Sequence, residues 1–296
     1  MDHLQLFAVT AAGPQPLKIA DGATELADLV HGLALGVYSS FRTFEHNKFL
    51  YLEDHLARTV RSMQLLGWDY LLDELLLRRA LHAVCTAAPW VETRVRIDLL
   101  AEPAQPLGSA SRVLIGVMPF KPLPAALYET GVNVGFADGL VREQPLVKTA
   151  AFVEARKHYT VGTRDMYERL MVNPQRQILE GFSSNFYAIH QGVLRTAGAA
   201  VLEGITRKII LDLAGQLGVP LRLEAVHIDE LSALTETAIS SSSRGLLPVV
   251  TIAGQQIGTG RPGPVITRLR KAYDAFVART IQPALQIFPP MKDGLL

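Results

Sequence analysis

The sequence has one cysteine, no excess of either charge and no long uncharged apolar run. Cys85 alone excludes an internal disulfide and any cysteine-based zinc site. The formal net charge is +1 and no basic stretch is interleaved with aromatics, so nucleic acid and acidic membranes are not expected partners. No stretch is apolar enough to span a bilayer, and the first residues lack the pattern of a secretory signal. These absences favour a soluble, cytoplasmic protein without a metal site.

The composition predicts a folded protein with a sizeable core, since 49% of the 296 residues are hydrophobic and 19% are charged. Strand-like and helix-like segments alternate irregularly, which favours an α+β fold over a regular βαβ fold. Residues 121–125 include two prolines and are the best candidate for a linker. We expect a small N-terminal α/β domain over residues 1–120, a linker over 121–128 and a larger domain over 129–296.

Hydrophobic periodicity and turn residues predict the individual elements. Helices are expected over residues 53–66, 71–87, 150–168 and 205–217. Strands are expected over residues 93–100, 112–120 and 132–137, with two more strands within 33–52 and a hairpin over 178–196 that turns at Gln191-Gly192.

Lys148 is the only charged residue between Gln144 and Val153. We expect it at a strand-to-helix junction. Burial of such a lysine disfavours the ammonium form and frees the amine for Schiff-base chemistry. The alternative is an ordinary lysine that extends into solvent.

Glu180 and Asn185 flank a tight turn before a strand over residues 186–189. A carboxylate at this position can face a pyridine nitrogen and keep it protonated, with the asparagine orienting the carboxylate. The alternative is that both are ordinary turn residues.

Two later segments carry the donors of an anion site. Glu203-Gly-Ile-Thr-Arg207 begins the helix expected from Ile205, and its free amides with the Thr206 hydroxyl suit a phosphate, although an ordinary helix start has the same pattern. Ser240–Gly245 contains four consecutive serines, which form either a hydroxyl cup for an anion or a flexible loop. Arg244 can bind a carboxylate or phosphate through two hydrogen bonds, or form a surface salt bridge.

The order of these motifs resembles the class IV aminotransferases, which are fold-type IV enzymes that use pyridoxal 5′-phosphate. The order is a lysine, Glu-Gly-x-x-x-Asn, Gly-Ile-Thr-Arg and a serine-rich cup before x-Pro-Val, and the resemblance runs from about Gly36 to about Leu269. It includes Gly258–Val265, which looks like the late glycine-rich segment of the family. The resemblance implies a barrel-like β core in the larger domain, an active site between the two domains and a homodimer.

The resemblance also implies a role for each matching residue. Lys148 would form the Schiff base and shuttle the proton between the substrate and the cofactor, and Glu180 would pair with the pyridinium nitrogen. Residues implied to bind the cofactor are Arg58, Lys148, Glu180, Asn185, Ile205, Thr206, Ser241 and Ser242.

The substrate side departs from the family pattern. Ser39 and Ser40 follow Tyr38, where the family often has Glu-Gly or Glu-Val. Phe152 and Val153 occupy the neighbourhood in which branched-chain enzymes place a tyrosine. Leu100-Ala-Glu102 replaces Thr-Arg-Gly and so removes the arginine that helps D-amino acid enzymes trap the substrate carboxylate. Arg244, Arg42 and Arg96 could take over that role, and strand-surface charge is the alternative for the last two. The candidates for substrate binding are Tyr38, Arg96, Ser243 and Arg244.

The sequence therefore predicts an aminotransferase that exchanges an amino group between an amino acid and a 2-oxo acid, such as 2-oxoglutarate or pyruvate, through a Schiff base on Lys148. Branched-chain or other apolar amino acids are favoured as donors because they are frequent in the family. The alternatives within the family are a D-amino acid or (R)-amine transaminase and an aminodeoxychorismate lyase-type enzyme that eliminates pyruvate. Outside it, the alternative is a phosphate-ligand binder without catalysis.

Overall fold

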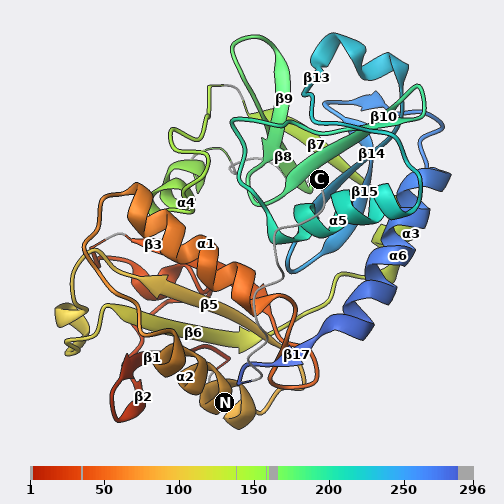
Figure 1. Ribbon diagram of the computed structural model, residues 1–296. Coiled ribbons are helices and arrows are strands. Elements are labelled where there is room, and N and C mark those ends of the chain that lie inside the picture. Colours follow the sequence, from red (N-terminus) through yellow and green to blue (C-terminus); the bar gives the residue numbers. More distant parts are fainter. Residues whose placement is uncertain (1–2, 35, 138, 158, 160–165, 286–296) are drawn as a thin grey trace. The chain divides into compact units, whose positions relative to one another are not determined.

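The computed structural model describes residues 3–34, 36–137, 139–157, 159 and 166–285, and within them the chain divides into two compact units (Figure 1). The first unit contains the described residues up to Phe120, together with Lys148–Ala150 and residues 280–285. The second contains Lys121–Val147 and Ala151–Arg279. Residues 148–150 and those from 280 onward fall in the first unit, whereas the sequence placed them in the larger domain. The reason is long-range pairing, because Thr149 pairs with Val37 and Gln282 pairs with Phe49.

The first unit is built on a five-stranded antiparallel sheet in the order β2-β1-β6-β5-β3. The strands are β1 (Gln5–Thr10), β2 (Gly13–Pro16), β3 (Val37–Arg42), β5 (Thr93–Leu99) and β6 (Val113–Pro119). The strands predicted over residues 93–100 and 112–120 are present as β5 and β6, and they pair with each other. The short strands β4 (Lys48–Phe49) and β17 (Gln282–Pro283) pair with each other, which ties the chain beyond Thr280 to this unit.

Two long helices cover this sheet, α1 (Leu52–Leu65) and α2 (Glu74–Ala87), and two 3-10 turns complete the unit, η1 (Asp28–Val30) and η2 (Gln105–Leu107). α1 packs against β3, and α2 packs against β1, β2 and β6. α2 begins three residues later than predicted because Asp73 caps it, accepting a hydrogen bond from the Leu76 amide.

The second unit is built on a ten-stranded sheet. Its strands are β7 (Val132–Ala137), β8 (Glu168–Val172), β9 (Gln177–Gly181), β10 (Asn185–His190), β11 (Val193–Arg195), β12 (Leu221–Arg222), β13 (Val226–His227), β14 (Leu234–Ser241), β15 (Gly245–Ile252) and β16 (Gln255–Gln256). Along the order β10-β14-β15-β7-β8-β9, the last strand pairs back to the first through Asn185 and Glu180, so the sheet closes on itself. The predicted barrel-like β core is therefore confirmed.

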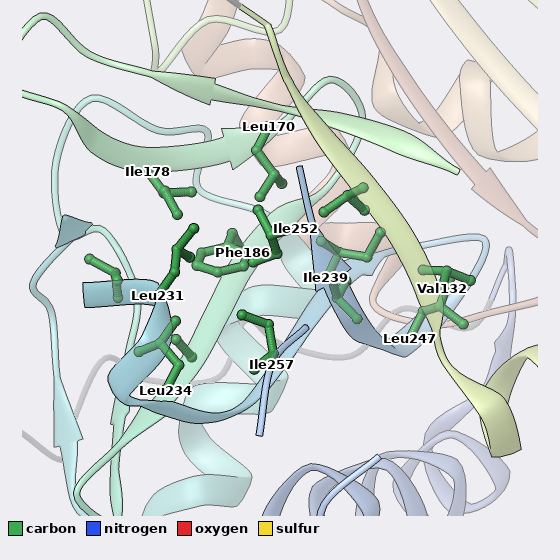
Figure 2. Close-up of a cluster of buried hydrophobic side chains, with 14 residues drawn as sticks. Val132, Leu170, Ile178, Phe186, Leu231, Leu234, Ile239, Leu247, Ile252 and Ile257 are labelled. Carbon is green, nitrogen blue, oxygen red and sulfur yellow. The ribbon is translucent and has the colours of Figure 1, made fainter. Parts of the chain in front are cut away.

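The inside of this barrel is apolar and closely packed. Figure 2 shows Leu170, Ile178, Phe186 and Ile239 turned toward one another from different strands. Phe186 and Leu170 are almost completely buried, and burial of side chains of this size stabilises a fold by about 1.5–3 kcal/mol each. Because the interior holds a core, the polar candidate residues lie at the ends of its strands.

The helices of the second unit are α3 (Ala125–Thr130), α4 (Ala150–Lys157), α5 (Ile205–Gln216), α6 (Pro264–Thr280) and the 3-10 helix η3 (Ile228–Ala233). Two predictions here need correction. The helix expected over residues 150–168 ends at Lys157, and Glu168 begins β8 because it pairs in parallel with β7; residues 158 and 160–165 lie outside the described residues. The segment expected as one hairpin over 178–196 contains three strands, and only β10 and β11 form the hairpin that turns at Gln191-Gly192.

Over the described ranges, no helix combines the length and the apolarity that crossing a membrane requires. Within the same residues, no group of three or more His, Cys, Asp or Glu side chains is arranged to hold a metal ion.

Candidate active site

Lys148 is fixed in the first unit by backbone pairing with β3. Its carbonyl oxygen accepts a hydrogen bond from the Tyr38 amide (3.0 Å), and the amide of Ala150 donates to the carbonyl of Gly36 (2.9 Å). Thr149 forms a β-bridge with Val37, and α4 begins at the next residue. The backbone of Lys148 is therefore held as a short strand at the edge of the sheet, directly before a helix.

The side chain of Lys148 lies against an aromatic ring. Its Nζ atom is 4.7 Å from the centre of the Tyr38 ring, and the guanidinium carbon of Arg96 is 4.1 Å from the same centre. Arg96 donates two hydrogen bonds to Asp98, from Nε to Oδ2 (2.7 Å) and from Nη2 to Oδ1 (2.6 Å). The structure thus brings two of the predicted substrate-binding residues, Tyr38 and Arg96, to the predicted catalytic lysine.

Arg58 lies on the opposite face of β3. Ser39 follows Tyr38 in the strand, so its side chain points toward α1, where its Oγ accepts a hydrogen bond from Nη2 of Arg58 (3.1 Å). The same oxygen lies 2.8 Å from Nδ1 of His55. Burial, together with the positive charges of Arg58 and Lys148, holds the pKa of His55 well below its usual value of 6.5. A neutral His55 imidazole adds no further positive charge beside Arg58 and Lys148.

Glu180 lies at the closure of the barrel in the second unit, and only 2% of it is exposed. Its Oε1 accepts a hydrogen bond from Nε of Arg142 (3.0 Å). Its Oε2 accepts one from the side-chain amide of Asn185 and one from the backbone amide of Leu202, each at 3.1 Å. Three donors from separate parts of the chain therefore fix the orientation of this carboxylate.

The start of α5 lies beside Asn185. The helix begins at Ile205 after Gly204, and no side chain caps its first turn. A Cβ atom on Gly204 would lie 2.2 Å from Oδ1 of Asn185, so any larger residue here would displace the Asn185 side chain. The side-chain amide of Asn185 also donates to the carbonyl oxygen of Leu202 (2.8 Å). Asn185 therefore contacts both Glu180 and the residues directly before the first turn of α5. That first turn contains Ile205 and Thr206.

The serine-rich segment is the turn between β14 and β15 rather than a free loop. Ser240 pairs with Asn185 across the sheet, and its Oγ lies 2.8 Å from the Tyr187 hydroxyl. Ser241 ends β14, and its Oγ accepts a hydrogen bond from Nε of Arg244 (2.8 Å) and lies 3.4 Å from Oγ of Ser243. Ser242 lies in the turn between them. The serine-rich segment therefore begins beside Asn185, at Ser240.

Arg244 connects this turn to the turn that follows Glu180. Its Nη1 donates to Oε2 of Glu168 (3.1 Å), and its Nη2 donates to the carbonyl (3.1 Å) and hydroxyl (2.6 Å) oxygens of Ser183. Glu168 also accepts hydrogen bonds from the amide and hydroxyl of Ser183 and from the hydroxyl of Ser184.

Glu168 and Arg244 each stabilise the charged form of the other. Burial alone would raise the pKa of Glu168, but the charge of Arg244 and the bonds from Ser184 and Ser183 hold that pKa below its usual value. Burial likewise disfavours the charged guanidinium, and the neighbouring Glu168 outweighs that effect and raises the pKa of Arg244. Arg244 is thus part of a buried ion pair between two turns.

Other candidates from the sequence lie elsewhere. Arg42 forms an ion pair with Glu92, and its guanidinium carbon lies 3.9 Å from the centre of the Phe120 ring. Phe152, where branched-chain enzymes have a tyrosine nearby, packs in an apolar cluster with Phe182 and contacts Arg142.

Sequence reasoning missed four residues that hold the candidates in place: Ser39, His55, Asp98 and Arg142. Asp98 had a detectable signal, because it shares a strand face with Arg96 at a spacing of two residues. His55 likewise precedes Arg58 by three residues, one helical turn. The contact of Arg142 with Glu180 had no local signal, because 38 residues separate them.

Comparisons with known proteins agree with this arrangement. The sequence profile of the family described as amino-transferase class IV matches residues 36–252, more than half of the chain. The chain is 35% identical over 102 residues to the D-alanine aminotransferase of Staphylococcus haemolyticus, and 36% identical over 107 residues to the branched-chain-amino-acid aminotransferase of Pseudomonas aeruginosa. These matches cover 34% and 36% of the chain, and they span about a third of the relatives' own length, 36% and 35%.

Solved structures are similar over nearly the whole chain. A T.th. branched-chain amino acid aminotransferase with pyridoxamine 5′-phosphate has a TM-score of 0.78 and 19% identity, covering 96% of this chain and 99% of that one. At this identity the likeness concerns the fold, which is that of fold-type IV aminotransferases. The family profile, the matching motif order and the fold agree, and the chain belongs to the class IV aminotransferase family.

Proposed function

We propose that this protein is a pyridoxal 5′-phosphate-dependent aminotransferase, in which Lys148 is the catalytic residue. The observation that carries the proposal is the setting of Lys148, whose backbone is pinned to β3 and whose Nζ lies 4.7 Å from the Tyr38 ring centre. A lysine whose backbone is held in this way keeps its amine in a defined position. Formation of a Schiff base with a carbonyl group requires such an amine.

Two groups of residues have the chemistry that the two ends of the cofactor require. A phosphate needs charged donors, backbone amides and hydroxyls. The candidates for these donors are the Arg58 guanidinium, the first turn of α5 with Ile205 and Thr206, and the hydroxyls of Ser241 and Ser242. A ring nitrogen needs an oriented carboxylate, and Glu180 is oriented by Asn185, Arg142 and Leu202.

The bound cofactor would supply an electron sink that acidifies the Cα–H bond of the amino donor. The chain's own residues would do the rest. Nζ of Lys148 would take the proton from Cα and return it during the exchange. Tyr38 would limit where Nζ can move, and Glu180 would hold a negative charge against the ring nitrogen.

The proposed donors are branched-chain or other apolar amino acids, with a 2-oxo acid as acceptor. The match to a branched-chain enzyme from P. aeruginosa supports this class, and the match to a D-alanine enzyme supports D-amino acids as the competing class. We further propose a cytoplasmic homodimer, as the family resemblance implies; light scattering of the purified protein tests the oligomeric state.

The test is an absorbance spectrum of the purified protein, followed by separate additions of L-leucine, D-alanine and (R)-1-phenylethylamine. We expect a visible cofactor band that is lost with one donor and restored by a 2-oxo acid. Release of pyruvate without an added acceptor would point to the lyase instead. Lys148→Ala should abolish the band and the exchange, whereas Lys157→Ala, at an exposed lysine of α4, should change neither. A Lys148→Ala protein that still exchanges amino groups would overturn the proposal.

A further inference from the structure

Asp98 is a buried carboxylate for which the proposed function gives no role. Its side chain and that of Arg96 are each only 5% exposed, and they form a two-pronged ion pair beside Tyr38. Removing two charges from water is costly, and apolar side chains of similar volume often stabilise a core as well or better. Stability alone therefore does not explain why this pair lies next to the predicted catalytic lysine.

The pair is built into one strand. Arg96 and Asp98 are two residues apart in β5, so they project from the same face, and the register of the sheet pairs Asp98 with Tyr38 and Arg96 with Ser40. Asp98 thus stays beside the guanidinium whether or not a substrate is present. A substrate carboxylate would have to displace a partner that the chain holds in place.

Asp98 and Tyr38 contact different parts of the Arg96 guanidinium. Asp98 occupies the Nε and Nη2 edge of the guanidinium, one of the edges that can bind a carboxylate with two parallel hydrogen bonds. The guanidinium carbon lies over the Tyr38 ring, 4.1 Å from its centre. Arg96 therefore supports Tyr38 while this edge and the positive charge are already paired with Asp98.

The charge of Asp98 also acts on any second anion near this site. The distances from the Tyr38 ring centre place the guanidinium carbon of Arg96 within about 9 Å of Nζ of Lys148. A distal carboxylate of a substrate bound at Lys148 would meet a neutralised guanidinium and a like-charged Asp98. Repulsion of this kind is a common way to reject a competing ligand.

We propose that Asp98 is a specificity-determining residue that rejects dicarboxylate substrates by occupying Arg96. Resting on the proposed function, this inference assigns the site to amino donors with uncharged side chains and to monocarboxylate acceptors. Pyruvate is then a better acceptor than 2-oxoglutarate, and L-leucine a better donor than L-glutamate.

The test compares kcat/KM for 2-oxoglutarate and pyruvate in the cofactor-loaded enzyme and in Asp98→Asn. We expect the wild type to prefer pyruvate, and Asp98→Asn to raise the ratio of 2-oxoglutarate to pyruvate by about tenfold or more, since a charge-assisted hydrogen bond becomes available. The double variant Arg96→Gln/Asp98→Asn removes the attracting and the repelling group together, and its ratio should stay within about threefold of the wild type.

A matched control is Glu25→Gln. Glu25 pairs with Arg94 on the same face of β5, but both side chains are exposed, 57% and 42%. Loss of this exposed carboxylate partner should leave the substrate ratio unchanged. The double variant also serves if Asp98→Asn alone fails to fold, because it leaves no unpaired buried charge.

A second measurement does not depend on turnover. Calorimetry with the unreactive acids glutarate and 4-methylvalerate should show tighter binding of 4-methylvalerate to the wild type and a gain for glutarate in Asp98→Asn. Equal binding of the two acids by the wild type, or an unchanged ratio in Asp98→Asn with the visible cofactor band intact, would overturn the inference alone. Absence of the cofactor band from the wild type would instead overturn the proposed function.

Discussion

Buried charge is arranged differently around the candidate residues of the two units. The first unit gathers cations around β3, with Lys148 and Arg96 against the Tyr38 ring and Arg58 against the Ser39 hydroxyl. The second gathers carboxylates, and Glu168 and Glu180 are each surrounded by donors. Of these three cations, Lys148 lies against a neutral ring and Arg58 against a neutral hydroxyl, whereas Arg96 is also paired with Asp98.

This difference matches two chemical tasks. A carboxylate with many donors keeps one orientation and remains an acceptor, which suits a fixed contact to a ring nitrogen. An ammonium group that lies against an aromatic ring is attracted to it, which holds Nζ of Lys148 near Tyr38. The contrast can be tested by removing one charge at a time, beginning with the change that should have the largest effect.

Glu168→Ala should cost about 3–5 kcal/mol of unfolding free energy, because it leaves the buried Arg244 guanidinium without its carboxylate. Urea denaturation followed by far-UV circular dichroism measures the loss. Both tryptophans, Trp68 and Trp90, lie in the first unit, so their fluorescence separately reports whether that unit unfolds later. A loss below about 1 kcal/mol would show that the pair contributes little.

Glu180→Gln should lower kcat of the proposed exchange by about 100-fold, because an oriented negative charge is replaced by a neutral amide of the same shape. Stopped-flow absorbance of a single turnover measures the rate. Glu203→Gln, at an exposed carboxylate near the start of α5, is the matched control and should retain the wild-type rate. If Glu180→Gln reacts as fast as this control, the proposed role of Glu180 is wrong.

His55 should make stability depend on pH in a defined window. Its pKa is lowered in the folded state, so below the unfolded value of 6.5 the unfolded chain binds one more proton than the folded chain. Stability should therefore be complete above pH 6.5 and fall by up to about 1.4 kcal/mol per pH unit below it. His55→Asn should flatten this slope between pH 5 and 6.5, and His31→Asn, at an exposed histidine, should not. Equal slopes in both variants would exclude His55 as the cause.

Arg176→Gln should have the smallest effect. Its ion pair with Asp229 is short, 2.6 Å, but the two side chains are 59% and 66% exposed, so water competes for both charges. We expect a change within about 0.5 kcal/mol in urea denaturation. A loss as large as that of Glu168→Ala would mean that pairing rather than burial sets the contribution of these charges.

The sequence was sufficient for elements whose signals are local. β7 has the predicted bounds, and α5 ends one residue before the predicted end, because period and turn residues define each without reference to distant strands. The turn at Gln191-Gly192 was also predictable, and both residues have the positive φ (50° and 78°) that such a hairpin turn requires.

Long-range pairing could not be predicted in this way. The start of β8 at Glu168 depends on parallel pairing with β7, and Lys148 reaches Tyr38 only because its backbone adds to the edge of β3. The partners of Glu168 lie 15, 16 and 76 residues away in the chain. The motif order predicted which residues matter, and only the folded chain shows which partners orient them.

The most direct test of the central claim identifies the lysine that binds the cofactor. Protein incubated with pyridoxal 5′-phosphate is reduced with borohydride, digested, and mapped by mass spectrometry. The account predicts that the phosphopyridoxyl group is found on the peptide containing Lys148 in the wild type and on no peptide in Lys148→Ala. Stoichiometric labelling of another lysine, with Lys148 unmodified, would contradict it.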